Sequence, residues 1–372
     1  MPASTPAWAF LASFLASSFL ASSFATTATA SSSSVLEAHA YVPEYRDASR
    51  AALACAHARG RARVRVLAFS AEFTADGLVR DVGRALATKR SAFRAAAADA
   101  NARVDASSAS ASASASACAF DLVIGGGGRS DAFSAALSTA RGVERAAREA
   151  VREVKARAYD GASFDWEYPR DASEWASYAA LLCATKRAFG DDAHRVSFSL
   201  HPSADTFKYV KQFRMLDCAD TAYVMAYDFS PTNERPNDGH SALGAVIGLL
   251  KYINASNVVE DASKLMLGIP FYGRRVSDFG DAKTYEERVR AMGDAFEPTR
   301  AFEDGVVFNS VEIVRAKVRE AKKFGFGGVM VWELGQDVPI DQEGVSLFDA
   351  ILDEAAKLDD DGVDYASRHE DL

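Results

Sequence analysis

Two carboxylates separated by a single residue stand at the end of a short strand-like run, in the segment Tyr159–Pro169. Alternate side chains of a β-strand share a face, so Asp165 and Glu167 point one way while Phe164 and Trp166 point the other. A rise of about 3.4 Å per residue places the two carboxylates roughly 7 Å apart. One acid that protonates a leaving oxygen and one anion that supports a developing cation are what a glycosidase needs. A solvated acidic strand end is the alternative interpretation.

Other strand-like runs also end in polar or aromatic residues that could face the same space. In chain order these candidates are Tyr45, Met225, Tyr227, Asp228, Tyr272, Arg274 and Trp332. A Met and a Tyr two residues apart, or a Trp near a strand end, are more often core residues. An Asp directly after the Met-x-Tyr pair favours a functional interpretation, because a carboxylate has no place in an apolar core.

The elements that must position these residues alternate along the chain. We expect eight strands, at Ala38–Tyr45, Val64–Ser70, Phe120–Ile124, Ser163–Glu167, Val196–His201, Ala222–Tyr227, Leu265–Ile269 and Gly328–Trp332. Helical patterns fall between them, at Ala48–Arg59, Leu78–Ala100, Gly142–Ala156, Trp175–Phe189, Ser241–Ile253, Tyr285–Met292 and Val311–Phe324. Three of these helices are expected to begin at the capping residues Asp47, Asp171 and Asn309.

Buried strands that alternate with crossover helices predict an α/β fold with a parallel sheet. Eight such units are typical of a (β/α)8 TIM barrel, whose site lies at the carboxyl ends of the strands. A doubly wound open sheet is the alternative, but the run Gly125–Gly128 lacks the glycine spacing of a dinucleotide-binding loop. The interval from Ile269 to Gly328 leaves little room for an inserted domain. We therefore expect a single domain over residues 38–358, without a large insertion domain.

Composition limits the partners and the compartment. The chain has 372 residues, 49% of them hydrophobic, and a net charge of −9, so it offers no basic stripe to a nucleic acid. Residues 1–30 carry no charged side chain and end in Ala28-Thr29-Ala30, which predicts a signal peptide. No later segment approaches the roughly 20 apolar residues of a membrane helix. We expect delivery to the secretory pathway, no membrane partner and a monomer.

The carboxyl terminus suggests a retained protein. Residues 359–372 form an acidic tail that ends in His369-Glu370-Asp371-Leu372, similar to the H-D-E-L retention signal with its two acids transposed. Retention in the endoplasmic reticulum therefore stands beside secretion and a lysosome or vacuole as the destination.

Four cysteines, Cys55, Cys118, Cys183 and Cys218, allow three pairings, and none lies in a metal-binding spacing. Buried thiols and one disulfide both remain open.

The segment around the two carboxylates resembles the signature of glycoside hydrolase family 18, the chitinases, which reads D-x-x-D-x-D-x-E. Asp160, Asp165 and Glu167 match this signature, and Ser163 replaces its middle Asp. The resemblance continues in family order along the chain. Met225–Asp228 is similar to the M-x-Y-D motif, Gly268–Arg274 to G-x-P-x-Y-G-R, and the run through Trp332 to the final strand.

The resemblance implies a retaining mechanism in which the N-acetyl group of the substrate is the nucleophile. Glu167 matches the general acid/base, and burial would raise its pKa. Asp165 matches the residue that orients the acetamide, and Tyr227 the hydroxyl that donates to its oxygen. Trp332 would stack under a sugar. The remaining substrate-binding candidates are Tyr45, Asp160, Ser163, Met225, Asp228, Tyr272 and Arg274, with no metal and no organic cofactor required.

Ser163 is the one departure within the signature. A Ser cannot carry the charge of the Asp that the family places there, so it removes a negative neighbour of Asp165. We therefore expect Asp165 to be ionised throughout the working pH range.

The expected function is hydrolysis of β-1,4-linked N-acetylglucosamine in chitin or chito-oligosaccharides, by an enzyme of the chitinase or chitobiase type. One alternative is an endo-β-N-acetylglucosaminidase acting on the core of N-glycans. Another is a non-catalytic chitinase-like lectin, which usually lacks the acid at the position of Glu167.

Overall fold

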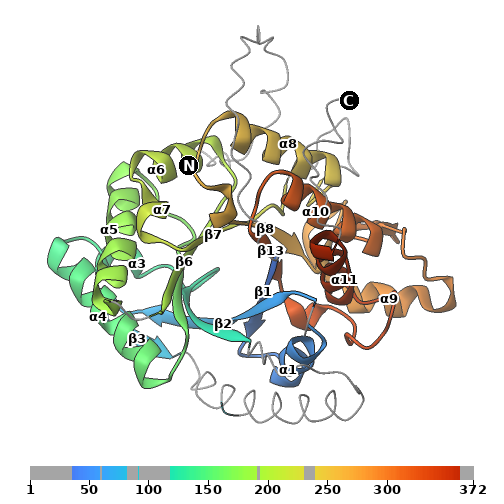
Figure 1. Ribbon diagram of the computed structural model, residues 1–372, viewed down its shortest axis with the longest axis horizontal. Coiled ribbons are helices and arrows are strands. Elements are labelled where there is room, and N and C mark those ends of the chain that lie inside the picture. Colours follow the sequence, from blue (N-terminus) through green and yellow to red (C-terminus); the bar gives the residue numbers. More distant parts are fainter. Residues whose placement is uncertain are drawn as a thin grey trace, which may run out of the picture.

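The computed structural model describes residues 36–58, 61–81, 91, 118–190, 193–229 and 239–360. Its main sheet is a ring of parallel strands that closes because β1 pairs with both β2 and β13 (Figure 1). The ring contains β1 (Glu37–Pro43), β2 (Arg63–Phe73), β4 (Ala119–Gly125), β5 (Gly161–Asp165), β6 (Arg195–Leu200), β7 (Thr221–Val224), β8 (Leu265–Pro270) and β13 (Gly328–Trp332). These are the eight expected strands in the expected order, which confirms the TIM barrel.

Helices surround the strand ring (Figure 1). They are α1 (Ala48–His57), α3 (Phe133–Ala136), α4 (Ala140–Ala156), α5 (Ala172–Phe189), α6 (Ala204–Gln212), α7 (Met215–Cys218), α8 (Leu243–Ala255), α9 (Tyr285–Met292), α10 (Val311–Lys323) and α11 (Leu347–Asp360), with the 3-10 turns η3 (Ala262–Lys264), η4 (Gly293–Ala295) and η5 (Leu334–Gln336). Apolar residues at helical spacing form their inner faces, as in α4, where Val143, Ala147, Ala150 and Val154 are buried.

The expected caps are confirmed at two helices and wrong at a third. Asp47 accepts a hydrogen bond from the backbone of Ser49 at the start of α1, and Asp171 caps α5 in the same way. Ser310, the next residue after Asn309, caps α10. The Asn309 side chain is unavailable for capping because it bonds to Pro270 and Lys317 inside the protein.

The helix expected over Leu78–Ala100 is also wrong at its start. Residues Val79–Asp81 form β3, which runs antiparallel to the end of β2. Most of the remaining residues of that expected helix lie outside the described part of the chain.

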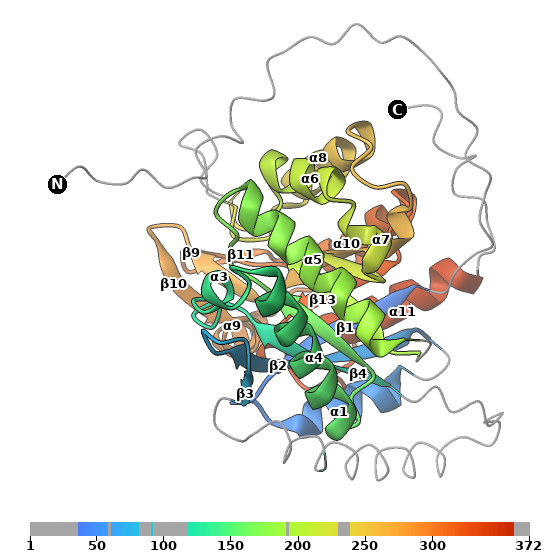
Figure 2. The same ribbon diagram turned by 90° about the vertical axis from the view of Figure 1, so that its left-hand side faces the viewer.

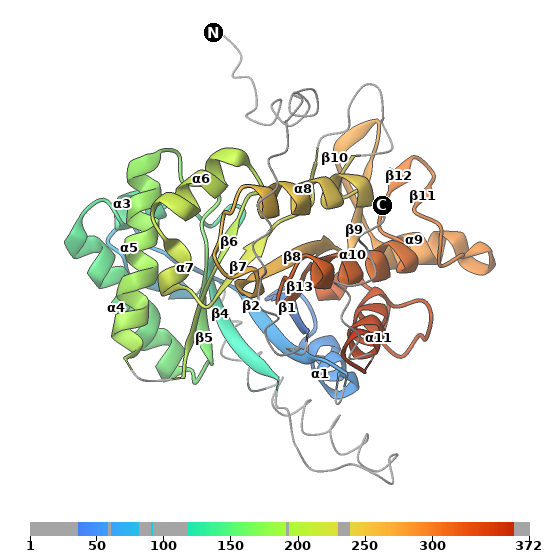
Figure 3. The same cartoon turned by 45° about the horizontal axis from the view of Figure 1, so that its top comes forward.

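A small antiparallel sheet occupies the interval between β8 and β13. Its strands are β9 (Tyr272–Arg275), β10 (Asp278–Thr284), β11 (Phe302–Glu303) and β12 (Val306–Val307). Figures 2 and 3 show it grouped with α9 on one side of the barrel. The interval that seemed too short for an inserted domain therefore holds a compact addition to the barrel, which brings Tyr272 and Arg274 out of strand β8 and onto a separate ribbon.

All four cysteines form disulfides, so the expectation of buried thiols or a single bond is wrong. Cys55 of α1 is joined to Cys118 just before β4, and Cys183 of α5 to Cys218 of α7.

Within the described residues, no helix is long and apolar enough to cross a membrane. The helix α11 runs to Asp360, so the tail boundary expected at residue 359 falls inside a helix. The leader and the last four residues lie outside the described part.

Side chains from the strands fill the interior of the barrel. One apolar layer is made of Tyr41, Leu67, Phe69, Val123, Tyr223, Met225, Met266 and Met330. Nearer the amino ends lies an ion pair between Arg65 and Asp121, with 2.6 Å between Nη1 and Oδ1. A Cβ at Gly161 would lie 2.5 Å from that same oxygen of Asp121. A glycine at the start of β5 is therefore required by this pair.

Candidate active site

The carboxylates of Asp165 and Glu167 lie at the carboxyl end of β5, where hydrogen bonds join the backbone of both residues to the loop after β4. Asp165 is the last residue of β5 and is 3% exposed. Its carbonyl oxygen accepts a hydrogen bond from the backbone of Gly126 at 2.6 Å and another from the Ser130 hydroxyl at 2.9 Å. The backbone N–H of Glu167 donates to the same hydroxyl at 3.0 Å. Ser130 thus fixes the turn that carries the chain from one carboxylate to the other.

The glycine run allows this close approach of backbones. Gly125 and Gly126 have φ angles of 105° and 101°, in the left-handed region. A Cβ at Gly125 would lie 2.2 Å from the carbonyl oxygen of Asp165, and one at Gly126 would lie 2.2 Å from the ring of Phe69. The backbone of Gly127 reaches Glu167, where its hydrogen bond favours the ionised carboxylate. The backbone of this glycine run therefore forms part of the candidate site.

Burial dominates the protonation of both acids. Burial raises the pKa of Glu167, as expected, and the charge of Asp228 raises it further. Burial also raises the pKa of Asp165 well above its ordinary value, and the charge of Glu167 adds to this effect. This shift works against the expected ionisation of Asp165 throughout the working pH range. The absence of a carboxylate at Ser163 does not compensate for the loss of water around Asp165.

Asp228 is the centre of a second group, contributed by β7 and β9. The Tyr272 hydroxyl donates to Asp228 Oδ2 at 2.8 Å, and Arg274 donates to both carboxylate oxygens at 2.8 and 2.9 Å. His240 Nδ1 lies 3.2 Å from Asp228 Oδ1. Although burial alone would raise it, these partners hold the pKa of Asp228 below its usual range. Asp228 therefore stays ionised and presents a fixed negative charge to Glu167.

The aromatic candidates surround these carboxylates. Tyr227 lies against Tyr272, with 6.3 Å between ring centroids, and burial raises the pKa of Tyr227 well above its ordinary value. Trp332 is half-buried at the end of β13 and packs on Tyr41 and Phe69, at centroid distances of 5.2 and 4.8 Å. A neutral phenol and a partly exposed indole are suited to a sugar ligand.

Four other predicted residues have different surroundings. Met225 and Ser163 are buried inside the barrel, and Ser163 is 0% exposed. Tyr45 is 64% exposed, with the Arg46 guanidinium over its ring. Asp160 lies before the amino end of β5, where it accepts a hydrogen bond from the backbone of Phe120 at 2.7 Å. Asp160 is therefore at the opposite end of β5 from Glu167, and the structure does not bring it to the other candidates.

Sequence reasoning missed a buried lysine that fixes two strand ends. Lys317 of α10 donates to the carbonyl and hydroxyl oxygens of Ser241 at 2.5 and 2.7 Å and to Asn309 Oδ1 at 2.7 Å. The Ser241 hydroxyl in turn donates to the carbonyl of Ala226, and Asn309 donates to that of Pro270. Lys317 thus links the ends of β7 and β8, although burial lowers its pKa. Lys317 lies on the apolar face of α10, three residues after Val314 and four before Ala321, so the helical pattern could have indicated its burial but not its partners.

Two further ionic groups were missed at the ends of β1 and β13. Arg129 pairs with Glu44 and also donates to the carbonyl of Ser70 at 2.9 Å. Arg46 donates to Glu333 at 2.7 Å between Nε and Oε1. Because these pairs join residues far apart in the sequence, no local motif could indicate them.

The role of Asp228 gives a testable pH dependence. In Asp228→Asn the neighbouring negative charge that raises the pKa of Glu167 is lost, so that pKa falls. An acid with a lower pKa is deprotonated at a lower pH, so the alkaline limb of the pH–rate profile moves to lower pH. Loss of the charged hydrogen bonds to Arg274 lowers kcat by about 10-fold or more. Profiles of kcat against pH for Asp228→Asn and for Asp281→Asn, whose carboxylate pairs with Arg275 on β9, measure this. Identical alkaline limbs in the wild type and Asp228→Asn would contradict the coupling.

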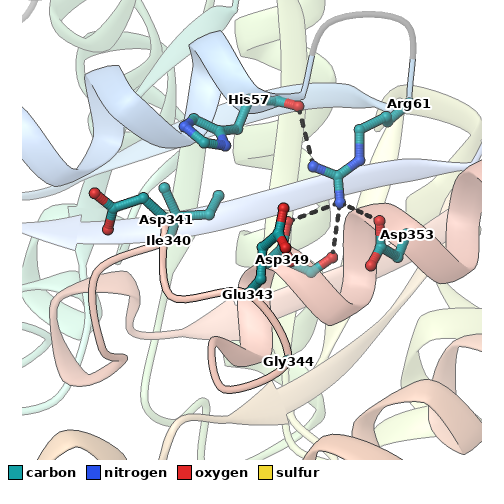
Figure 4. Close-up of a pocket in the computed structure, with 8 residues that line it drawn as sticks. All are labelled: His57, Arg61, Ile340, Asp341, Glu343, Gly344, Asp349 and Asp353. Atoms are coloured by element: carbon teal, nitrogen blue, oxygen red, sulfur yellow. Dashed lines mark hydrogen bonds and ion pairs between the residues drawn. The ribbon is translucent and has the colours of Figure 1, made fainter.

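A pocket of about 610 Å³ lies elsewhere, between α1 and the chain that leads into α11 (Figure 4). Its lining includes the carboxylates of Asp341, Glu343, Asp349 and Asp353. Arg61 crosses it and pairs with Asp349 and Asp353 at 2.8 and 2.5 Å. None of its lining residues is one of the candidate site residues at the carboxyl ends of the barrel strands.

Among the described residues, no group of three or more His, Cys, Asp or Glu side chains is arranged to hold a metal ion.

Comparisons with known proteins identify the family to which the chain is similar. Residues 106–337 match the family described as Glycosyl hydrolases family 18. Endochitinase 1 of Metarhizium robertsii is 28% identical over 263 residues, which are 58% of this chain and 61% of that relative. Chitotriosidase-1 of Mus musculus is 26% identical over 258 residues, 55% of each chain. The matched part thus spans about three fifths of these curated relatives or less.

Solved structures share the fold at lower identity. A chitinase from Bacteroides thetaiotaomicron gives a TM-score of 0.69 at 16% identity and covers 91% of this chain and 100% of its own. A chitinase from Cycas revoluta in complex with (GlcNAc)3 gives 0.63 at 20% identity, with coverage of 87% and 99%.

Proposed function

This chain belongs to glycosyl hydrolases family 18, and on that premise we propose that it hydrolyses β-1,4 bonds between N-acetylglucosamine units of chitin or chito-oligosaccharides. The observation that carries the proposal is the pair Asp165 and Glu167. At the carboxyl end of β5, Asp165 is buried and Glu167 is partly buried, and burial raises the pKa of each. An acid that keeps its proton near neutral pH is what protonation of a glycosidic oxygen requires.

The proposed reaction proceeds in two displacements at the anomeric carbon. The carbonyl oxygen of the substrate's own acetamide forms a bond to that carbon while the bond to the leaving oxygen breaks. Glu167 transfers its proton to the leaving oxygen, and an oxazolinium ion results. Glu167 then takes a proton from water as that water bonds to the same carbon and the bond from this carbon to the acetamide oxygen breaks, so the product keeps its anomeric configuration.

Two other residues serve the acetamide. Ionised Asp165 accepts a hydrogen bond from its N–H and balances the positive charge of the oxazolinium ion, while the Tyr227 hydroxyl donates to its oxygen. Trp332 provides an apolar surface for the sugar ring. Asp228, fixed by Arg274 and Tyr272, keeps Glu167 protonated until the substrate binds.

The stereochemistry of the product tests this proposal. Proton NMR during the hydrolysis of chitobiose and longer chito-oligosaccharides should show the β-anomer first, before mutarotation. An α-anomer at the first turnover would exclude substrate assistance. Parallel incubation with an N-glycan identifies an endo-β-N-acetylglucosaminidase, and binding without products identifies a lectin.

We also propose that the protein enters the secretory pathway, from which it is secreted, sent to a lysosome or vacuole, or retained through its last four residues. The leader-like residues 1–30 and the two disulfides support this, because disulfides persist mainly in oxidising compartments. Amino-terminal sequencing of the protein purified from its natural source should begin after Ala30. A mature chain that still starts at Met1 would contradict the proposal.

A further inference from the structure

The surroundings of Asp165 inside the barrel consist of hydroxyl groups. Tyr41 on β1 and Ser199 on β6 face it, and their hydroxyl oxygens lie 2.8 Å apart. Phe198 pairs with Phe164 in the β5–β6 register, so Ser199 lies beside Asp165, and both hydroxyls act to lower the pKa of Asp165. Tyr41, Asp165 and Ser199 are 1%, 3% and 2% exposed, so the contact is shielded from solvent.

Ser163 does not take part in this contact, although it lies on the same inward face of β5. Its hydroxyl oxygen is fully buried and has no hydrogen-bond partner among the described residues. Asp165 Oδ1 likewise has no partner there. This oxygen is itself buried, and Ser163 supplies no hydrogen bond to it.

Among the residues that the structure describes, no cationic side chain pairs with Asp165. The titratable groups that face it are the carboxylate of Glu167 and the phenols of Tyr41, Tyr168, Tyr178 and Tyr227. The orientation and charge of Asp165 in this dry site thus depend on neutral donors. Hydrogen bonds to a charged group are roughly twice as strong as neutral ones.

We propose that Ser199 is a positioning residue, which together with Tyr41 holds Asp165 in the orientation for reaction and replaces the inner carboxylate absent at Ser163. The inference rests on the proposed glycosidase function, since Asp165 is the group that would meet the acetamide. The hydroxyls of Tyr41 on β1 and Ser199 on β6 thus replace the polar contact that a carboxylate at position 163 on β5 would provide. No sequence motif assigns Ser199 a role, because its partner Tyr41 is 158 residues away.

The variant Ser199→Ala tests the proposal, and Ser197→Ala is the matched control. Ser197 lies on the same strand and face and is 1% exposed, but its hydroxyl oxygen has no hydrogen-bond partner among the described residues. Ser199→Ala should lower kcat roughly 10- to 100-fold on chito-oligosaccharides, with a smaller change in KM. Ser199→Thr, which keeps the hydroxyl, should recover most of this loss.

The pH profile separates positioning from a general loss of structure. Hydrogen bonds from Ser199 and Tyr41 lower the pKa of Asp165, so their removal raises it. Because Asp165 acts in its ionised form, the acidic limb of kcat in Ser199→Ala should move to higher pH. In Ser197→Ala it should stay where the wild type has it. Equal kcat values and superimposed acidic limbs for the wild type and Ser199→Ala would overturn the proposal.

A measurement without substrate distinguishes failure of this inference from failure of the proposed function. Carbon-13 NMR of labelled Asp side chains follows the titration of Asp165 in the free protein. A higher pKa in Ser199→Ala but not in Ser197→Ala supports the contact even if no oligosaccharide is cleaved, whereas an unchanged titration overturns it. Failure of the wild type to hydrolyse any N-acetylglucosamine oligosaccharide counts against the proposed function alone.

Discussion

Glu167→Gln should lower the hydrolysis of chito-oligosaccharides by about 10²- to 10⁴-fold while their binding persists, because general acid catalysis contributes roughly that factor. Gln has nearly the size of Glu and keeps hydrogen-bonding capacity, but it has no proton to transfer to the leaving oxygen. Burial and the charge of Asp228 raise the pKa of Glu167. The substitution therefore removes a proton donor rather than a residue that only supports the structure. Turnover assays and calorimetric titration with the same oligosaccharide measure the two effects.

The matched control for this experiment is Glu174→Gln. Glu174 lies in the first turn of α5 and pairs with Arg170, which is mostly exposed. Its substitution should leave turnover unchanged, since surface ion pairs contribute little to stability. Undiminished turnover in Glu167→Gln would remove this residue from the reaction.

Asp165→Asn should lower kcat by about 10²- to 10³-fold, the range found for loss of one preorganised electrostatic contact to a transition state. Asn preserves the shape of the side chain but cannot balance the positive charge of the oxazolinium ion. Asp160→Asn is the control, because Asp160 is at the other end of the same strand. It should leave kcat unchanged, and a comparable loss of kcat in Asp160→Asn would contradict the assignment.

Asp165→Asn should also make the protein more stable near neutral pH. The folded state raises the pKa of Asp165 above its unfolded value, so the folded protein binds this proton more tightly. As pH rises from the unfolded-state pKa of Asp165 to its higher folded-state pKa, the free energy of unfolding therefore decreases, and an Asn at this position avoids the decrease. Denaturant unfolding at pH 7 and at pH 4 should show a larger stability gain for Asp165→Asn at the higher pH. A variant that is less active and also less stable at pH 7 would contradict this account.

The strands and their order were predictable because strands buried on both faces are read directly as apolar runs. The pair Asp165 and Glu167 was predictable for a similar reason, since both residues lie in one short segment. Tyr227 and Asp228 follow one another in the chain, and so their common location at a strand end could also be expected. In each case the informative spacing is local.

Contacts between distant strands carry no such signal. Ser199 and His240 look like ordinary loop or strand residues until β1 or β9 is placed beside them. Asp160 belongs to the same motif as Glu167, yet its position before β5 puts it at the amino end of the barrel. The rise in the pKa of Asp165 was not predictable, because a sequence shows which charges are absent but not how much water is excluded.

The pairing of the first barrel strand with the last has a consequence for biosynthesis. Tyr41 emerges from the ribosome early, whereas its neighbours Ser199 of β6 and Trp332 of β13 are synthesised much later. Until β13 takes its place, β1 and β8 both present unpaired backbone groups, and such edges can pair with other chains. The ring of barrel strands therefore closes in the same event that brings Trp332 beside Tyr41, so that an unfinished chain lacks both the closed ring and this part of the candidate site.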